Sequence, residues 1–143
     1  MTKLDLSKVR RELGLVPPEE TYFNLLGQVS SRSNSSERKQ GAVIVKCDSV
    51  IATACFDAYE KKIDDRIVGA GAIENAISSC AKNGISTDKA TLFVYSFPND
   101  IVCKLLAKAG ISEIWYIKDT GDSLGKEFCQ KAGIKLNQFK RTT

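Results

Sequence analysis

Histidine, the commonest general base and metal ligand near neutral pH, is absent from all 143 residues of this sequence. Its absence excludes Ser-His and Cys-His nucleophiles, zinc sites that contain histidine and a histidine pH switch. Candidate groups for acid–base or nucleophilic chemistry without histidine are Cys55, Asp57, Glu74 and Asp100. Because no pair among them has a spacing that requires a particular mechanism, an enzyme with zinc-independent chemistry is the weaker interpretation.

Cysteines form the second candidate set, and their number is odd and includes no C-x-x-C pair. Disulfide frameworks and zinc knuckles use even, closely spaced sets, so neither is indicated. Each cysteine lies in an apolar or mixed segment, which is typical of small core residues in a reducing compartment. We therefore expect core thiols at Cys47, Cys55, Cys80, Cys103 and Cys129.

Basic residues gather in a polar loop near the N-terminal third of the chain, and the net charge is +4. This balance is compatible with a phosphate-bearing ligand or with nucleic acid. The loop predicts either such a contact or an ordinary solvated surface. The basic residues in question are Arg32, Arg38, Lys39 and Lys46.

The length corresponds to one domain over residues 1–143, since domains usually contain about 100–200 residues. We divide it into an N-terminal helical extension over residues 1–18 and a core over residues 19–139. No apolar run approaches the roughly 18 residues that a membrane span needs. The charged start lacks the apolar stretch of a signal peptide, so we expect a cytoplasmic protein without membrane contact.

The elements that must position the candidate side chains change in type along the chain. Two β-branched runs over residues 41–46 and 49–56, separated by Cys47 and Asp48, predict a hairpin of buried strands. Strand–helix alternation follows, which predicts a mixed sheet with helices on both faces, an α/β fold. We expect helices over residues 4–13, 19–31, 68–82, 101–110 and 123–133, strands over residues 90–97 and 113–118, and a final strand or extended tail over residues 134–139.

Four strings stand in a distinctive order and spacing, namely YFNLLGQVSSRSNSSERKQGAVIV, IATACF, AIENAI and KLLAKAGISEIWYI. On these strings the chain resembles the cytidine and deoxycytidylate deaminase superfamily, most closely its deoxycytidylate deaminase branch, over residues 20–137. The resemblance implies a three-layer α/β/α fold with a mixed five-stranded sheet.

Members of that superfamily hold a zinc ion with one His and two Cys and shuttle protons with a Glu. Their motifs are H-A-E at the start of one helix and P-C-x-x-C at the start of the next. The matching positions here hold Gly71 for the His, Ile73 for the Glu, and Asn99 and Val102 for the two Cys. Because a zinc site needs three or four protein ligands, the resemblance implies a homologue without metal, cofactor or catalytic residues.

Two residues lie one position beyond these motifs. Cys103 and Glu74 are each turned by about 100° around a helix from the motif position. We expect Cys103 to point away from the site and Glu74 to be a helix-face residue. On the substrate side, Phe56 stands where the resemblance places a ribose-contacting Asn.

The residues that replace the metal ligands and the proton shuttle suit a site without metal. Ile73 and Val102 are expected to bury branched side chains where the metal and its water would sit, and Asn99 or Asp100 to cap the second helix. The cavity is then either packed shut or reshaped into a small pocket between two helix N-termini. Such a pocket favours an anion, for example phosphate or carboxylate.

We therefore predict a non-catalytic deaminase-like protein that acts by binding, either as a nucleotide or small-anion binder or as a structural or regulatory subunit. Its expected partner is a second copy or another deaminase-like chain. The alternative is a nucleotide- or nucleic-acid-binding module that uses the basic loop 32–46. The predicted ligand-binding residues are Arg32, Arg38, Lys39, Phe56, Glu74, Asn99 and Asp100.

Overall fold

The computed structural model describes residues 5, 8–9, 12–14, 18–33, 40–58 and 69–140. Of the predicted N-terminal helix over residues 4–13, the structure describes residues 5, 8–9 and 12–13, and residues 8, 9 and 12 are helical. The other residues of that helix and most of the predicted extension lie outside the described residues. The elements are α2 (Pro18–Ser30), β1 (Gly41–Lys46), β2 (Ser49–Cys55), β3 (Asp57–Ala58), β4 (Gly69–Ala70), α3 (Ala72–Lys82), β5 (Thr91–Phe93), α4 (Asp100–Lys108), β6 (Glu113–Tyr116), α5 (Ser123–Lys131) and β7 (Lys135–Gln138).

The main sheet has five strands in the order β2-β1-β5-β6-β7. Strand β1 pairs antiparallel with both β2 and β5, whereas β5, β6 and β7 run parallel to one another. The predicted mixed five-stranded sheet is thus confirmed, and the chain end over residues 134–139 contributes a strand rather than a tail.

The β1–β2 hairpin turns at the two residues that the sequence indicates. Cys47 and Asp48 both have positive φ angles, 52° and 60°, as a two-residue type I′ turn requires. The prediction that both strands are buried is only half right. Strand β1 is buried over Gly41–Val45, but β2 is the edge strand and its side chains are exposed or half-buried. Cys47, in the turn, is exposed rather than a core thiol, and Cys55 at the end of β2 is only half-buried.

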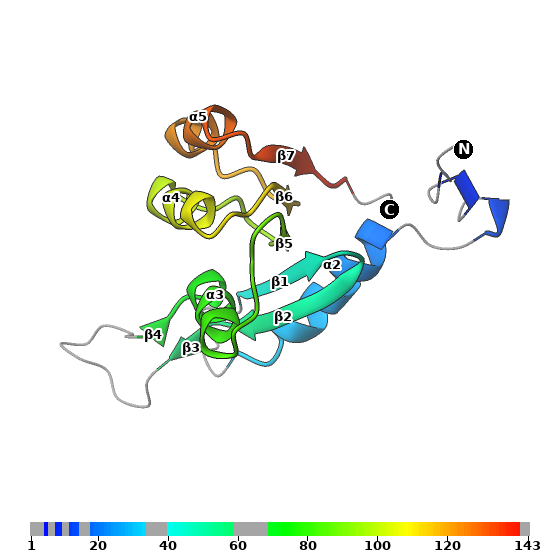
Figure 1. Ribbon diagram of the computed structural model, residues 1–143, viewed down its shortest axis with the longest axis horizontal. Coiled ribbons are helices and arrows are strands. Elements are labelled where there is room, and N and C mark those ends of the chain that lie inside the picture. The colour runs from blue at the N-terminus through cyan, green and yellow to red at the C-terminus, as the bar shows by residue number, and fades with distance from the viewer. Residues whose placement is uncertain are drawn as a thin grey trace.

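Helices cover both faces of the sheet and give the three layers that the sequence predicts (Figure 1). Ala42 and Ile44 of β1 belong to a core shared with α3, α4 and α5. Val43 and Val45, the alternate residues of the same strand, pack with α2 in a second core. Both faces of β1 are buried, which explains the unbroken apolar run in this strand.

Helix α3 begins later than the sequence predicts. The helix starts at Ala72, not at Val68, because Gly69–Ala70 form β4 and pair antiparallel with Asp57–Ala58 of β3. Within the described part of the chain, no helix combines the length and the apolar character needed to cross a membrane.

Candidate functional site

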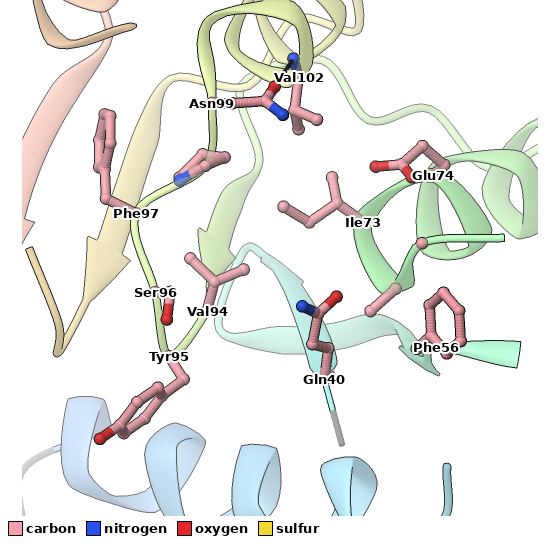
Figure 2. A pocket seen from close by; sticks show the side chains of 14 residues that line it. Gln40, Phe56, Ile73, Glu74, Val94, Tyr95, Ser96, Phe97, Asn99 and Val102 are labelled. Carbon is pink, nitrogen blue, oxygen red and sulfur yellow. Dashed lines mark hydrogen bonds between the residues drawn. The ribbon is translucent and has the colours of Figure 1, made fainter. Parts of the chain in front are cut away.

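A cavity of about 460 Å³ opens where the first turns of α3 and α4 face each other (Figure 2). Its third wall is the segment that leaves β5 and leads to α4, and its fourth comes from the residues around the start of β1 and the end of β2. The cavity is open, so of the two alternatives stated above, packed shut or reshaped into a pocket, the structure has the second. The described lining residues are Gln40, Gly41, Phe56, Gly71–Glu74, Val94–Asn99 and Val102.

On the α3 side, Gly71 is the N-cap residue and has an extended backbone, with φ −64° and ψ 154°. Asn75 anchors the first turn of the helix, since its side-chain amide donates a hydrogen bond to the Cys55 carbonyl at 3.1 Å. Ile73 is half-buried and faces the cavity (Figure 2). It therefore forms part of a wall and does not fill the hole as expected.

Glu74 also lines the cavity, so its interpretation as a helix-face residue is wrong. Its carboxylate reaches back over the start of the helix: a Cβ atom placed on Gly71 would lie only 2.8 Å from Glu74 Cδ. The reach is possible because Gly71 has no side chain. An acidic group in this first turn is also stabilised by the positive end of the helix dipole.

On the α4 side, Asn99 caps the helix. Its Oδ1 accepts a hydrogen bond from the backbone N–H of Val102 at 2.9 Å. Of the two capping candidates, Asn99 therefore performs the role, while Asp100 stands in the first turn and does not line the cavity. Val102 is half-buried and contributes to the cavity wall.

Cys103 points away from the cavity, as the helical rotation predicts. The residue is fully buried, and its thiol donates a weak hydrogen bond to the Pro98 carbonyl with Sγ and O 3.7 Å apart. A hydrogen bond with the Cys129 thiol of α5, together with burial, raises the pKa of Cys103 far above its ordinary value. This thiol belongs to the α4–α5 interface and is not a metal ligand at the cavity.

Residues outside the cavity fix the positions of its aromatic walls, Phe97 and Phe56. Phe97 packs edge-on against Tyr116, with ring centroids 5.0 Å apart, and its carbonyl accepts from Thr120 Oγ1 at 3.2 Å. The backbone of Phe56 donates to the Gln40 carbonyl and accepts from Ser33 Oγ, both at 2.8 Å. Hydrogen bonds and ring packing within the protein thus hold both walls in place.

Of the basic residues predicted to contact a ligand, the two that the structure describes, Arg32 and Lys46, do not line the cavity. Arg32 is exposed and does not line it, and Arg38 and Lys39 lie outside the described residues. Lys46 stands at the far end of β1 from Gly41, about 17 Å away by strand geometry, and its Nζ donates to the Ser86 carbonyl. A six-residue strand thus separates this cation from the site.

The described lining contains one charged side chain, that of Glu74. Each helix N-terminus carries the equivalent of roughly half a positive charge, so the carboxylate offsets about two such termini. The predicted preference for an anion is therefore not supported by the described lining. A neutral, hydrogen-bonding ligand fits these charges better.

The segment after β5 supplies lining residues that sequence reasoning missed, notably Tyr95 and Ser96. Gln40, just before β1, was missed as well. The signal that could have found the first two is their position directly after the carboxyl end of a strand of the parallel part of the sheet, where ligands of α/β folds bind.

Zinc, the metal of the superfamily that the sequence resembles, does not fit the donor set at this cavity. Gly71, Ile73 and Val102 have no coordinating side-chain atom, and the side-chain oxygen of Asn99 accepts from Val102. Among the described residues, no group of three or more His, Cys, Asp and Glu side chains is placed to hold a metal ion. Glu74 alone cannot replace the three or four ligands that zinc needs.

Comparison with known proteins agrees with the fold. ComE operon protein 2 of Bacillus subtilis (strain 168) is 30% identical over 121 residues, which is 76% of this chain and 64% of that protein. The chain thus spans less than two thirds of the length of this relative. The crystal structure of dCMP deaminase from the cyanophage S-TIM5 in apo form is 25% identical, with a TM-score of 0.73 over 85% of this chain and 96% of that one.

A second crystal structure of the cyanophage enzyme, in complex with dCMP and dUMP, superposes with a TM-score of 0.75 over 87% of this chain and 99% of that chain, at 24% identity. The predicted superfamily and fold are thereby confirmed. The family model of the MafB19-like deaminases matches residues 18–141 of the sequence, a range that includes every described residue of the cavity. The chain belongs to the MafB19-like deaminase family.

Proposed function

We propose that this protein is a non-catalytic member of the deaminase fold that binds a nucleobase in the cavity between α3 and α4 and leaves it chemically unchanged. One observation carries the proposal. The positions that match the zinc ligands and the proton shuttle hold Gly71, Ile73, Asn99 and Val102, yet the cavity that they line stays open at about 460 Å³.

The chemistry of deamination supports the absence of catalysis. Zinc-dependent deaminases attack the base with a metal-activated water, while a carboxylate transfers protons. Ile73 and Val102 present hydrocarbon to the cavity, and Asn99 uses its oxygen to cap α4. No described lining residue is placed to activate water through a metal.

The shape of the cavity supports the binding of a nucleobase. Ligand sites are usually concave spaces of about 300–1,000 Å³ with apolar and aromatic walls and a few polar groups. Phe56, Val94 and Phe97 provide buried walls, and the side chains of Gln40 and Glu74 provide polar groups. The neighbouring cyanophage enzyme has been crystallised with dCMP and dUMP, which supports a nucleobase as the ligand class.

Assembly with a second copy, or with an active deaminase-like chain, remains part of the proposal. Ile101 and Leu105, one turn apart on α4, and Leu124 on α5 are apolar and exposed, by 72%, 36% and 60%. If the partner is a second copy, sedimentation of the purified protein alone should give a mass above that of one chain. If the partner is an active deaminase-like chain, the larger mass should appear only after that chain is added.

A sharp test measures metal and turnover together. Purified protein is analysed for zinc by plasma mass spectrometry and then incubated with dCMP, cytidine and guanosine while ammonia is monitored, with an active zinc deaminase as positive control. We expect substoichiometric zinc and no ammonia above background, with nucleoside binding detectable by titration calorimetry. Stoichiometric zinc with ammonia release would overturn the proposal, and so would the absence of any nucleoside binding.

A further inference from the structure

The charged group of the cavity sits in an unusual place. The Glu74 carboxylate faces the interior from the first turn of α3 (Figure 2) and lies over the position that a side chain at residue 71 would occupy. Three of its atoms, Oε2, Cδ and Oε1, are the nearest neighbours of a Cβ built on Gly71. Residue 71 and Glu74 thus compete for one volume.

Backbone conformation does not explain the glycine. At φ −64° and ψ 154°, Gly71 is in a region that every residue adopts readily. What the glycine provides is space: without a Cβ, nothing prevents the carboxylate from lying at the cavity. Gly71 is therefore a positioning residue for Glu74.

A carboxylate can only accept hydrogen bonds, and its two oxygens suit two adjacent N–H donors. On the opposite side of the cavity, the nitrogen end of the Asn99 amide is turned toward Ile73 (Figure 2), because the oxygen end caps α4. The cavity thus offers an acceptor from α3 and a donor from α4. A base that turned carbonyl oxygens toward Glu74 would be repelled.

We infer that Glu74 selects the bound base, and that the preferred ligand presents two adjacent N–H donors beside a carbonyl group, as the N1–H, the 2-amino group and O6 of guanine do. The inference rests on the proposed function. Cytosine offers its amino group beside a ring acceptor, and uracil offers one N–H between two carbonyls, so both match Glu74 less well.

Two pairs of probes test the selection. Guanosine and inosine differ only in the 2-amino group, and cytidine and uridine differ at the edge that carries the 4-substituent. By titration calorimetry we expect guanosine to bind roughly 10- to 100-fold more tightly than inosine, because a hydrogen bond to a charged group is lost. Cytidine and uridine should both bind more weakly than guanosine.

Variants assign this preference to Glu74. Glu74→Gln keeps the shape but replaces one acceptor oxygen with a donor, so the guanosine-to-inosine ratio should collapse toward one. Glu127→Gln is the matched control, since Glu127 lies on α5 away from the cavity and pairs with Lys131. It should keep the ratio of the unchanged protein.

Gly71→Ala tests the positioning role without removing the carboxylate. The new methyl group must displace the Glu74 side chain, so guanosine affinity should fall about as much as in Glu74→Ala. In the Glu74→Ala background, the same glycine change should have little further effect, because the two act on one interaction. Thermal melts of each variant confirm that it is folded.

The outcomes separate the two claims. If none of the four nucleosides binds the unchanged protein, the proposed function fails and this inference falls with it. If nucleosides bind but guanosine and inosine bind equally, or Glu74→Gln keeps the original ratio, the inference alone is wrong. If the effects of Gly71→Ala and Glu74→Ala on guanosine affinity were additive in the double variant, the positioning role of Gly71 would be wrong.

Discussion

The side chain of Asn99 accepts a hydrogen bond from the backbone N–H of Val102 at 2.9 Å. The resemblance to the deaminase superfamily aligns these two residues with the metal-binding cysteines of the zinc enzymes. The first turn of α4 is therefore satisfied from within the protein, by an N-cap rather than by thiolates and a metal.

Removing this cap should destabilise the protein measurably. We expect Asn99→Ala to lower the free energy of unfolding by about 1 kcal/mol, and Asn99→Ser or Asn99→Asp to cost only a few tenths, since both keep a capping oxygen. Urea denaturation of the three variants measures this. Asp122→Ala, which removes the equivalent cap of α5, should cost a similar amount. Equal stability of Asn99→Ala and the unchanged protein would show that the cap has no energetic role.

Restoring the missing donors should restore a metal site. The combined variant Gly71→His, Ile73→Glu, Asn99→Cys and Val102→Cys places the donors of a zinc deaminase on a fold that superposes with one at a TM-score of 0.73. We expect it to bind about one zinc ion per chain, because one His and two Cys ligands then converge. The pair Asn99→Cys and Val102→Cys without the histidine is the control and should bind zinc more weakly. A folded four-residue variant that holds no zinc would contradict the idea that the helices keep the deaminase arrangement.

The cysteines should differ sharply in reactivity. Cys47 is exposed and Cys55 is half-buried, whereas Cys80, Cys103 and Cys129 are buried. Burial raises the pKa of Cys80, and the hydrogen bond with Cys129 together with burial raises that of Cys103, so both remain unreactive thiols. Mass spectrometry after brief treatment of the native protein with iodoacetamide should find label on Cys47 first. Rapid labelling of Cys103 would mean that this thiol faces the cavity after all.

Stability should fall in acid partly through Asp119. A hydrogen bond from Lys126, and a second from the Gly121 N–H at 2.8 Å, hold the pKa of Asp119 below its ordinary value. A lowered pKa means that the folded protein binds the proton less readily than the unfolded chain. The stabilisation is therefore present above the unfolded pKa of about 3.9 and is lost as the pH falls through the folded value.

The comparison of Asp119→Asn with the unchanged protein measures this contribution. The variant should be less stable at pH 7, and the difference should vanish in strong acid, where the aspartate is protonated in both states. Lys126 also lies 5.9 Å from the centre of the Phe97 ring, so this ion pair supports one wall of the cavity. A stability difference that stays constant with pH would refute the role of the charge.

Local patterns predicted most of the fold. Cys47 and Asp48 interrupt two β-branched runs and so locate the hairpin, and the order of strands and helices predicts the mixed sheet. The start of α3 was misplaced because Gly69 and Ala70 pair with β3, a contact between segments that periodicity within one helix does not reveal. The burial of β2 was overestimated because an edge strand has a neighbour on one side only.

The site shows where sequence reasoning stops. The rotation of one residue around a helix correctly placed Cys103, a short side chain whose direction follows its backbone. The same argument failed for Glu74, whose longer side chain reaches back over the space left by Gly71. Lys46 belongs to the predicted basic loop 32–46, yet an extended strand carries it to the end of β1 that lies far from the cavity.

Equilibrium dialysis followed by mass spectrometry of the retained nucleoside tests the central claim most directly. The protein is dialysed against an equimolar mixture of guanosine, inosine, cytidine and uridine, and the nucleosides on the protein side are identified. We predict enrichment of a nucleoside, with guanosine foremost, recovered with its amino group intact. Conversion of amino groups to carbonyl groups, or equal concentrations of all four on both sides of the membrane, would contradict the account.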